Sequence, residues 1–529
     1  MKKSLSEPPI LPPVDFDPPS NGEFCPSPPT VLGQRRYEMW KGIVEEKHRR
    51  LGITRRAFAE SACGTMAWLF TYSQLPACGG EGGAQGAGGS GGAGVGGGAG
   101  GSGGARGGMS GSSGGGGSGG SGAGGGGGSP DAGSPDQYTS PEDMSGYDVP
   151  PESMEDMARA GELLNHDPFV FDVQTHISFD EIRPWPERNP PDRVVDFLKR
   201  IFVQSNTTVA CLSGVPATRG IGLPNVQARQ KLFEFINQLA GPRLLYHCNA
   251  DPELPGEPDY MQQAQEMYKN VGAWKTYPQG ANHGLDHPDS VAFLEAARRL
   301  GVKVVASHRG ISGNGIYTSP GSPLDVVRAA KAFPDIKFLV YHSGWENGTN
   351  ENHAYADQGN NTRGVDRFIK ALQENDIGPT GNVYAELGST WFNLMGNAMA
   401  AGHVLGKLLQ QIGPDRIVWG TDTVFNGMAQ PQIDALWMFN MPNALASMYP
   451  ALTTEVKRKV LGLNGAAVYG VDPTAMRYAL QNDDIEKLRL AYRDDPRSVP
   501  MPHPRDYIGP RTRREFFALL RQQAAHGHG

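Results

Sequence analysis

The sequence predicts an α/β fold, a TIM-type (β/α)8 barrel, over about residues 165 to 475. Two observations predict it. Short apolar runs alternate with amphipathic helical stretches at a spacing of about 30 to 45 residues, which leaves room for a helix and its loops between strands. The runs are apolar throughout, as is typical of parallel strands that are buried on both faces. Eight such units in succession imply a closed barrel.

The predicted elements follow in chain order. The strands are residues 169–173, 208–212, 243–247, 271–274, 302–306, 336–340, 383–385 and 416–419. The helices between them are residues 194–202, 226–239, 260–269, 290–300, 322–332 and 367–375. We therefore assign residues 151–475 to one barrel domain.

The remainder of the chain differs from the barrel in composition. Residues 1–50 form a polar, Pro-rich extension, and residues 79–150 form a linker rich in Gly and Ser. The linker has almost no large apolar side chains, so it cannot bury enough surface to offset its chain entropy, and we expect it to be flexible. Residues 476–529 are charged and contain two helical stretches, at 484–492 and 511–524.

Residues 51–78 resemble an export signal. Arg55 and Arg56, with Phe58 two positions on, resemble a twin-arginine motif, and an apolar run follows at 62–77. That run is shorter than the roughly 20 apolar residues of a membrane span. The four residues that end at Cys78 resemble a lipobox, so lipidation of Cys78 and membrane attachment are expected with export to the periplasm. The alternative is a short amphipathic helix with two surface arginines.

Charge and cysteine usage exclude two classes of protein. The formal net charge is −7 and the isoelectric point is about 6.0, and no basic block follows residue 60. Nucleic acid is therefore not an expected partner, whereas a small-molecule substrate is. Cys211 and Cys248 lie in predicted strands, which predicts buried core residues and no disulfide framework. The sequence does not predict the oligomeric state.

Polar residues gather after the predicted strands, at the barrel end where active sites lie. The candidates are Gln174 and His176 after the first strand, Lys275 after the fourth, His308 and Arg309 after the fifth, His342 after the sixth, Glu386 after the seventh and Asp422 after the eighth. Because Gln174 and His176 are two residues apart, they share one face of a strand. A group of His and carboxylate side chains suits Zn²⁺, Mn²⁺ or Fe²⁺. Each histidine alone is more often a core residue than a ligand.

These motifs together resemble the amidohydrolase superfamily, within the amidohydrolase-related branch that includes aminocarboxymuconate semialdehyde decarboxylase. The resemblance covers about residues 166 to 475 and includes the Asp-x-x-x-His strand at 172–176, His308, His342, the Gly-Thr-Asp at 420–422 and the segment 464–470. It implies one divalent ion, Zn²⁺ first, held by His176, His308 and Asp422, with His342 as the catalytic histidine. Gln174 departs from the family pattern, which places a histidine there. It is interpreted as a weak ligand, as a residue that holds a metal-bound water, or as a sign of a degraded site.

The resemblance implies a hydrolase that acts on a small ester, lactone or amide through a metal-activated water. His342 would act as general acid and base, and Asp422 would share the proton transfer. Lys275, Arg309, Arg219 and Glu386 are candidates for binding the substrate, although Lys275 paired with Glu386 is an equal alternative. Two other functions stay open. One is a metal-dependent non-oxidative decarboxylase of an aromatic or unsaturated acid, and the other is a tethered, non-catalytic binding lipoprotein.

Overall fold

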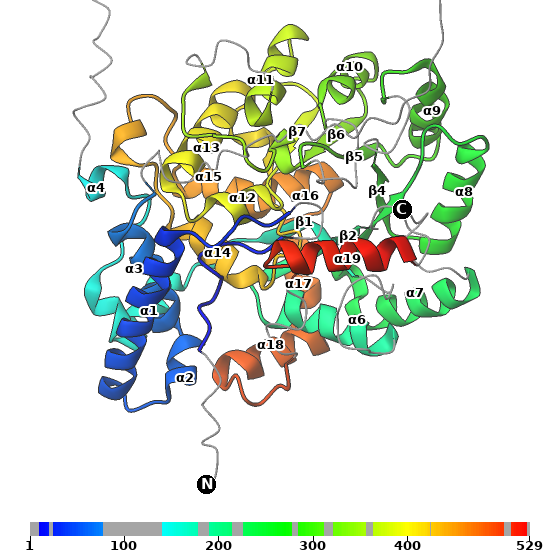
Figure 1. Cartoon of the computed structure of the whole chain (residues 1–529). Helices are drawn as coiled ribbons and strands as arrows, with labels where there is room; N and C mark the ends of the chain where they lie inside the picture. The colour runs from blue at the N-terminus through cyan, green and yellow to red at the C-terminus, as the bar shows by residue number, and fades with distance from the viewer. Residues whose placement is uncertain are drawn as a thin grey trace, which may run out of the picture.

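The centre of the molecule is a barrel of eight parallel strands, in the order β1 to β8, each paired with the next in the chain (Figure 1). The computed structural model describes residues 10–20, 25–77, 140–177, 190–213, 226–277, 284–311, 321–355, 363–423, 425–501 and 509–525. The strands are β1 (Val170–His176), β2 (Thr207–Ser213), β3 (Leu244–Asn249), β4 (Val271–Thr276), β5 (Val304–His308), β6 (Lys337–Tyr341), β7 (Val383–Glu386) and β8 (Ile417–Val418). The predicted TIM barrel is confirmed.

The barrel closes where the first strand meets the segment after the last. The Val173 amide donates to the Trp419 carbonyl at 2.9 Å, and the Asp422 amide donates to the Gln174 carbonyl at 2.9 Å. Because β1 and this segment run side by side, Gln174 and Asp422 are neighbours although they lie far apart in the sequence. The closure itself therefore brings two of the predicted site residues together.

Several strands extend further than the apolar runs predict. β1 continues to His176, β5 continues to His308 and β7 continues to Glu386, all of them polar residues at the barrel mouth. The backbone of a polar residue pairs in the ladder as readily as that of an apolar one, so the apolar pattern ends before the strand does. β8 is shorter than predicted because only two of its residues keep the ladder geometry.

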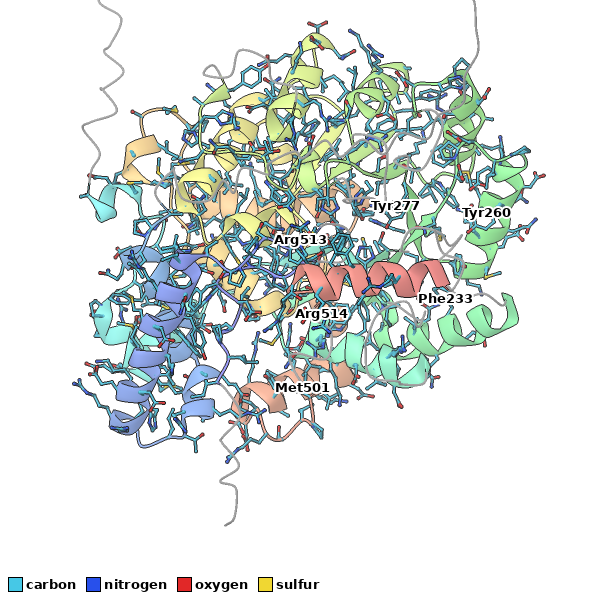
Figure 2. All side chains as sticks on the ribbon, in the orientation of Figure 1. Phe233, Tyr260, Tyr277, Met501, Arg513 and Arg514 are labelled. Carbon is cyan, nitrogen blue, oxygen red and sulfur yellow. The ribbon has the colours of Figure 1, made fainter. Side chains whose placement is uncertain are left out.

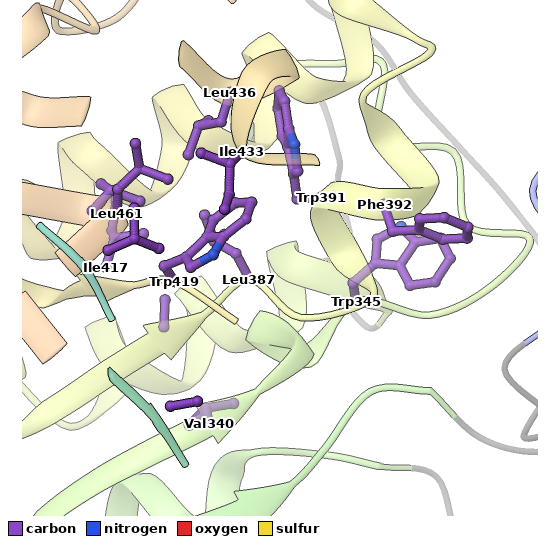
Figure 3. Packing of buried hydrophobic residues seen from close by; sticks show 14 of the residues in the cluster. Val340, Trp345, Leu387, Trp391, Phe392, Ile417, Trp419, Ile433, Leu436 and Leu461 are labelled. Carbon is purple, nitrogen blue, oxygen red and sulfur yellow. The ribbon is translucent and has the colours of Figure 1, made fainter. Parts of the chain in front are cut away.

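Helices surround the strands, and they pack on them through large apolar side chains. The helices of the barrel region are α6 (Pro190–Leu198), η3 (Lys199–Val203), α7 (Val226–Ala240), α8 (Glu257–Tyr268), α9 (Val291–Arg299), α10 (Leu324–Ala332), η7 (His342–Gly344), α11 (Gly364–Glu374), α12 (Thr390–Leu394), α13 (Ala398–Ile412), α14 (Ala429–Met438), α15 (Thr454–Arg458), η11 (Lys459–Leu463) and α16 (Asn464–Tyr469). In Figure 3, Trp419 lies beside Leu387 and Ile433, and all three belong to one buried cluster. The six predicted helices all form, with ends that differ by a few residues.

The chain before the linker forms three helices at one side of the barrel, drawn in blue in Figure 1. They are α1 (Val31–Arg50), α2 (Arg55–Ala59) and α3 (Ala62–Gln74). α4 (Pro141–Met144) forms within the last residues of the predicted linker, and η2 (Pro151–Met154) and α5 (Met157–Leu164) then lead into β1. α3 packs against α1, α5 and η2. Most of the linker and Cys78 lie outside the described residues, and export and lipidation stay predictions.

The C-terminal extension carries both of its predicted helices. It contains α17 (Pro473–Leu480), α18 (Asp484–Asp494) and α19 (Arg513–Ala525). Arg513 and Arg514 mark the start of α19 among the side chains of Figure 2. Within the described part of the chain, no helix combines the length and the apolar character that a bilayer span requires. Cys211 and Cys248 are buried free thiols, as predicted.

Candidate metal centre and active site

Five predicted site residues meet at the mouth of the barrel, and each of them is at most 3% exposed. Gln174 and His176 end β1, His308 ends β5, His342 begins η7 directly after β6, and Asp422 follows β8. Strand ends from opposite halves of the barrel converge because parallel strands all finish at one rim. The structure thus brings together the whole predicted set of metal ligands and the predicted catalytic histidine.

His176 faces Asp422 with its Nε2 atom, at 3.1 Å from Oδ1. The other ring nitrogen, Nδ1, lies 3.0 Å from the Ser213 carbonyl. A carbonyl can only accept a hydrogen bond, so Nδ1 carries a proton, and Nε2 is the ring atom directed at Asp422. Either a proton on Nε2 or a cation shared by the two groups makes this approach to a carboxylate oxygen favourable.

His308 and His342 form a second pair of the same kind. Nε2 of His308 donates to the Ile311 carbonyl at 3.2 Å, and Nδ1 of His342 donates to the Gly388 carbonyl at 2.6 Å. The remaining nitrogens, Nδ1 of His308 and Nε2 of His342, face each other at 3.2 Å. Burial lowers the pKa of His342 to about 4 and the pKa of His308 well below its usual value, so both rings are neutral at physiological pH.

Gln174 places its side-chain amide at the first pair. Nε2 is 3.2 Å from Oδ1 of Asp422 and 3.4 Å from Nε2 of His176. Oε1 is buried and has no hydrogen-bond partner among the described residues. The two amide atoms exchange places when the group rotates by a half turn, which would turn Oε1 toward His176 and Asp422.

The separations of these three donor groups are close to those around a bound ion. Zn²⁺ with bonds of about 2.0–2.1 Å in tetrahedral geometry separates its ligands by about 3.3 Å. The three groups lie 3.1, 3.2 and 3.4 Å apart. Two of these distances are measured to Nε2 of Gln174, and a half turn of the amide would put Oε1, which can ligate a cation, in the same place.

Asp422 is held in position by a short chain of hydrogen bonds. The Ser389 hydroxyl donates to Oδ2 of Asp422 at 2.5 Å, and Nδ2 of Asn426 donates to Ser389 Oγ at 2.9 Å. Burial opposes ionisation of Asp422, but its contacts with His176 and Ser389 outweigh burial and lower its pKa to about 2. Asp422 therefore presents an ionised oxygen, Oδ1, to the mouth of the barrel.

The backbone at this rim is strained at three functional positions. His342, Ser389 and Asp422 have φ angles of 60°, 55° and 58°. Residues other than glycine seldom adopt this left-handed conformation, and where they do the surrounding structure holds them in it. The strain marks the three turns that aim these side chains into the mouth.

The donor chemistry of this set fits one divalent cation. Among the residues that the structure describes, no three His, Cys, Asp or Glu side chains lie in a closed metal arrangement. They form the two pairs described above, and Gln174 joins the first pair. Each histidine donates its outer N–H to a backbone carbonyl, which is the arrangement that fixes the ring of a metal-binding histidine.

Lys275 lies near the end of β4 and Glu386 ends β7, and both are fully buried. Nζ of Lys275 is 3.0 Å from the centre of the Tyr341 ring and 4.9 Å from that of Tyr277. Glu386 accepts the His342 amide at 2.9 Å and the Gly388 amide at 2.5 Å, so it ties the ends of β6 and β7 together. Burial raises the pKa of Glu386 to about 8.

Arg309 and Arg219, the other predicted substrate contacts, are placed differently. Arg309 is 2% exposed, and it forms an ion pair with Asp325 and donates to the His308 carbonyl at 2.7 Å. Its guanidinium therefore braces the loop after β5, which is a structural role. Arg219 lies outside the described residues, as does the predicted lipidation site Cys78.

Sequence reasoning gave no role to four polar residues that support the site, although Asp172 belongs to the motif of the first strand and His247 ends the third predicted strand. Ser389 and Asn426 orient Asp422, and Asp172 accepts hydrogen bonds from the Thr421 hydroxyl and amide, so it ties β1 to the segment after β8. His247 lies between the hydroxyls of Tyr341 and Tyr469, at 2.6 Å from each. A carboxylate inside an apolar strand run was a usable signal for Asp172. Ser389 carried no such signal beyond its position three residues after Glu386.

Comparison with known proteins gives one family. A family model described as Amidohydrolase matches residues 241–471, from the start of β3 to the end of α16 and therefore less than half of the chain. This part of the chain carries the sequence pattern of that family. No curated protein matches the chain.

Solved structures that resemble the chain include decarboxylases and hydrolases. A 5-carboxyvanillate decarboxylase from Novosphingobium aromaticivorans with bound manganese is 11% identical, with 59% of this chain and 99% of that one covered and a TM-score of 0.38. A 2,6-dihydroxybenzoate decarboxylase from Rhizobium is 14% identical, with coverage of 57% and 99% and a TM-score of 0.36. A putative 2-pyrone-4,6-dicarboxylic acid hydrolase from Pseudomonas putida is 13% identical, with coverage of 58% and 98% and a TM-score of 0.38.

Proposed function

We propose that this chain is a metal-dependent hydrolase of the amidohydrolase superfamily that cleaves a small ester, lactone or amide. The observation that supports it most is the state of the three histidines at the barrel mouth. His176, His308 and His342 each donate one N–H to a backbone carbonyl and direct the other nitrogen toward the same rim as Asp422. Buried lone pairs in this number are what a site built for a cation presents.

One divalent ion would be held by His176, His308 and Asp422, with Gln174 beside them. Zn²⁺ is the first candidate because its preferred ligands are imidazole and carboxylate, and Mn²⁺ or Fe²⁺ is the alternative. When bound, the ion supplies positive charge that polarises a substrate carbonyl and acidifies a water.

His342 is the residue that would move the proton. Its Nδ1–H bond to the Gly388 carbonyl fixes the ring, so Nε2, which lies 3.2 Å from Nδ1 of His308, is the atom that would take a proton from the attacking water. The same atom then returns that proton to the leaving oxygen or nitrogen. Burial lowers the pKa of His342 to about 4, so the ring is neutral and Nε2 carries a lone pair at neutral pH.

Lys275 would bind an anionic group of the substrate. Its ammonium group lies 3.0 Å from the centre of the Tyr341 ring, on the strand β4 that ends at the same rim as the histidines. A positive charge at this place would attract a substrate carboxylate. A carboxylate in the substrate is also what a second candidate function, non-oxidative decarboxylation, requires.

Metal analysis combined with a substrate screen tests the proposal. We expect close to one equivalent of transition metal in the purified protein, and turnover of at least one ester, lactone or amide that carries a carboxylate. Release of CO₂ from an aromatic acid without hydrolysis would establish the decarboxylase instead. A metal content below about a tenth of an equivalent, unchanged by added Zn²⁺ or Mn²⁺, would leave the non-catalytic binding protein as the remaining function.

A further inference from the structure

Helix α3, which contains most of the apolar run of the predicted export signal, is buried within the folded protein. Five of its side chains, Cys63, Met66, Ala67, Trp68 and Leu69, have no exposed surface. Its partners are α1, α2, α4, α5 and η2, and of these α5 and η2 lie after the linker, in the same part of the chain as the barrel. A signal segment that is removed after export does not need a surface complementary to the mature protein.

Specific polar contacts join this region as well. Arg36 on α1 is 3% exposed, donates from Nε to the Leu75 carbonyl at 2.9 Å and lies over the Tyr72 ring at 4.7 Å. Glu155, beyond the linker, accepts hydrogen bonds from Lys47 at 2.7 Å and from Arg50 at 2.8 Å. A buried arginine with a defined acceptor indicates an evolved interface, because burial without such partners is unfavourable.

The arginines of the twin-arginine motif also have partners within the fold. Arg55 forms an ion pair with Glu45 on α1 at 2.6 Å, and Arg56 forms one with Glu60 at 2.9 Å. Thr54 caps α2 by accepting the Ala57 amide at 3.1 Å. The motif is therefore accounted for as the capped first turn of a surface helix.

A continuous row of aromatic rings runs from α3 to α12, the helix that follows Ser389. Trp68 contacts Tyr72 with ring centres 5.1 Å apart, Tyr72 contacts Tyr147 at 5.8 Å, Tyr147 contacts Phe439 at 5.6 Å and Phe439 contacts Trp391 at 5.4 Å. The Tyr147 hydroxyl also donates to the Met395 carbonyl at 2.7 Å, just beyond α12. Trp391 itself belongs to the barrel core (Figure 3).

We infer that residues 31–77 are a permanent part of the folded protein, packed on the side of the barrel that carries α12. Cleavage before Cys78 would remove α1, α2 and α3 together, and it would expose the aromatic surface formed by Tyr147 and its neighbours. The Gly-rich segment then joins two parts of one folded unit. This inference does not depend on the metal or on the proposed activity.

The mass of the protein from the cells that make it naturally is the first test. We expect an intact mass that includes residues 31–77 in every cell fraction. A mature form that begins at Cys78, whether lipidated or not, would overturn the inference and support the export prediction.

The second test separates packing from covalent connection. A protease site is inserted in the Gly-rich segment near residue 100 of the full-length chain, and the cut protein is passed through a size-exclusion column. We expect the N-terminal fragment to elute with the barrel, whereas separate elution of an intact barrel would overturn the inference. With the substitution Trp68→Ala, the fragment should separate from the barrel at a lower dilution than it does in the parent protein. Tyr478→Ala is the control: this tyrosine is 76% exposed, so its substitution should not change the dilution at which the fragment separates.

Discussion

Gln174 is the residue on which the proposed metal site depends most, because it stands where the family that the sequence resembles has a histidine. Its amide lies within 3.4 Å of both His176 and Asp422, and its oxygen has no other described partner. An amide oxygen is a harder and weaker donor than imidazole, so this position favours Mn²⁺ relative to a site with histidine. The sequence predicted the neighbourhood of Gln174, and the structure shows which atoms it contributes.

Substitution of Gln174 should change metal affinity in two directions. Gln174→Leu, which keeps the size and removes both polar atoms, should weaken Zn²⁺ and Mn²⁺ binding by roughly tenfold to a hundredfold. Gln174→His should strengthen Zn²⁺ binding relative to Mn²⁺. Competition with a fluorescent chelator measures both affinities, and equal affinities in all three proteins would show that Gln174 is not at the metal.

Substitution of His342 should separate chemistry from metal binding. His342→Ala removes the atom that takes the proton, so turnover should fall by at least about a hundredfold while the metal content stays at one equivalent. Turnover and metal content are measured on the same preparation. Loss of metal in this variant would make His342 a ligand and would transfer the acid–base role to Asp422.

At the scale of elements, the loop between β7 and α12 connects most of the site. Its Gly388 carbonyl accepts a hydrogen bond from Nδ1 of His342, and its Ser389 hydroxyl donates one to Asp422. A Cβ atom at Gly388 would lie 2.2 Å from Oε1 of Gln174 and 2.5 Å from Oε1 of Glu386, closer than any real contact. A larger residue at this position would have to displace the two buried side-chain oxygens.

Gly388→Ala should therefore lower both stability and metal affinity. Overpacking of this kind costs about 1–3 kcal/mol, and the displaced amide of Gln174 should reduce metal binding as well. Chemical denaturation and metal titration measure the two effects. Gly161→Ala is the matched control, since its Cβ would meet no atom within 4 Å; a Gly388→Ala protein that behaved like this control would contradict the packing argument.

A buried ion cluster fixes the loop after β6 to α11 and α13. Nζ of Lys407 lies 2.9 Å from Glu351 and 2.7 Å from Asp366, and all three side chains are at most 5% exposed. Lys407→Met would leave two buried carboxylates without their cation, and we expect a loss of about 3–5 kcal/mol in the free energy of unfolding. Urea denaturation measures it.

The control for this prediction is an ion pair on the surface of α11. Lys370 pairs with Glu374, and both side chains are about half exposed, so Lys370→Met should change stability by about 0–1 kcal/mol. A Lys407→Met variant that loses no more than Lys370→Met would show that the buried cluster contributes little.

At the scale of the whole molecule, the proposed ion would join strands from opposite sides of the barrel. His176 lies on β1, His308 on β5, and Asp422 follows β8. An ion that binds only this folded arrangement stabilises it by mass action, by about 2.7 kcal/mol at a hundred times its dissociation constant. Thermal unfolding should therefore shift upward with Zn²⁺ or Mn²⁺ and downward with a chelator. An unfolding midpoint that changes neither with added metal nor with the chelator would contradict the metal site.

The sequence by itself determined the barrel, because eight apolar strand runs and the six helical stretches between them are local signals. It also predicted that Gln174, His176, His308, His342 and Asp422 reach the rim, since each one follows an apolar run. It did not predict the roles of Ser389 and Asn426, because these depend on the conformation of loops, which no local sequence pattern predicts. Which nitrogen of each histidine faces inward likewise depends on carbonyls of other strands.

Tertiary structure alone decided the position of residues 31–77. Arg55, Arg56 and the apolar run after them have the same composition in an export signal and in a short buried helix. What distinguishes the two is whether a complementary surface exists elsewhere in the chain, and Tyr147 and α5 provide one. Packing between segments separated by a long linker depends on three-dimensional contact, and sequence periodicity carries no information about it.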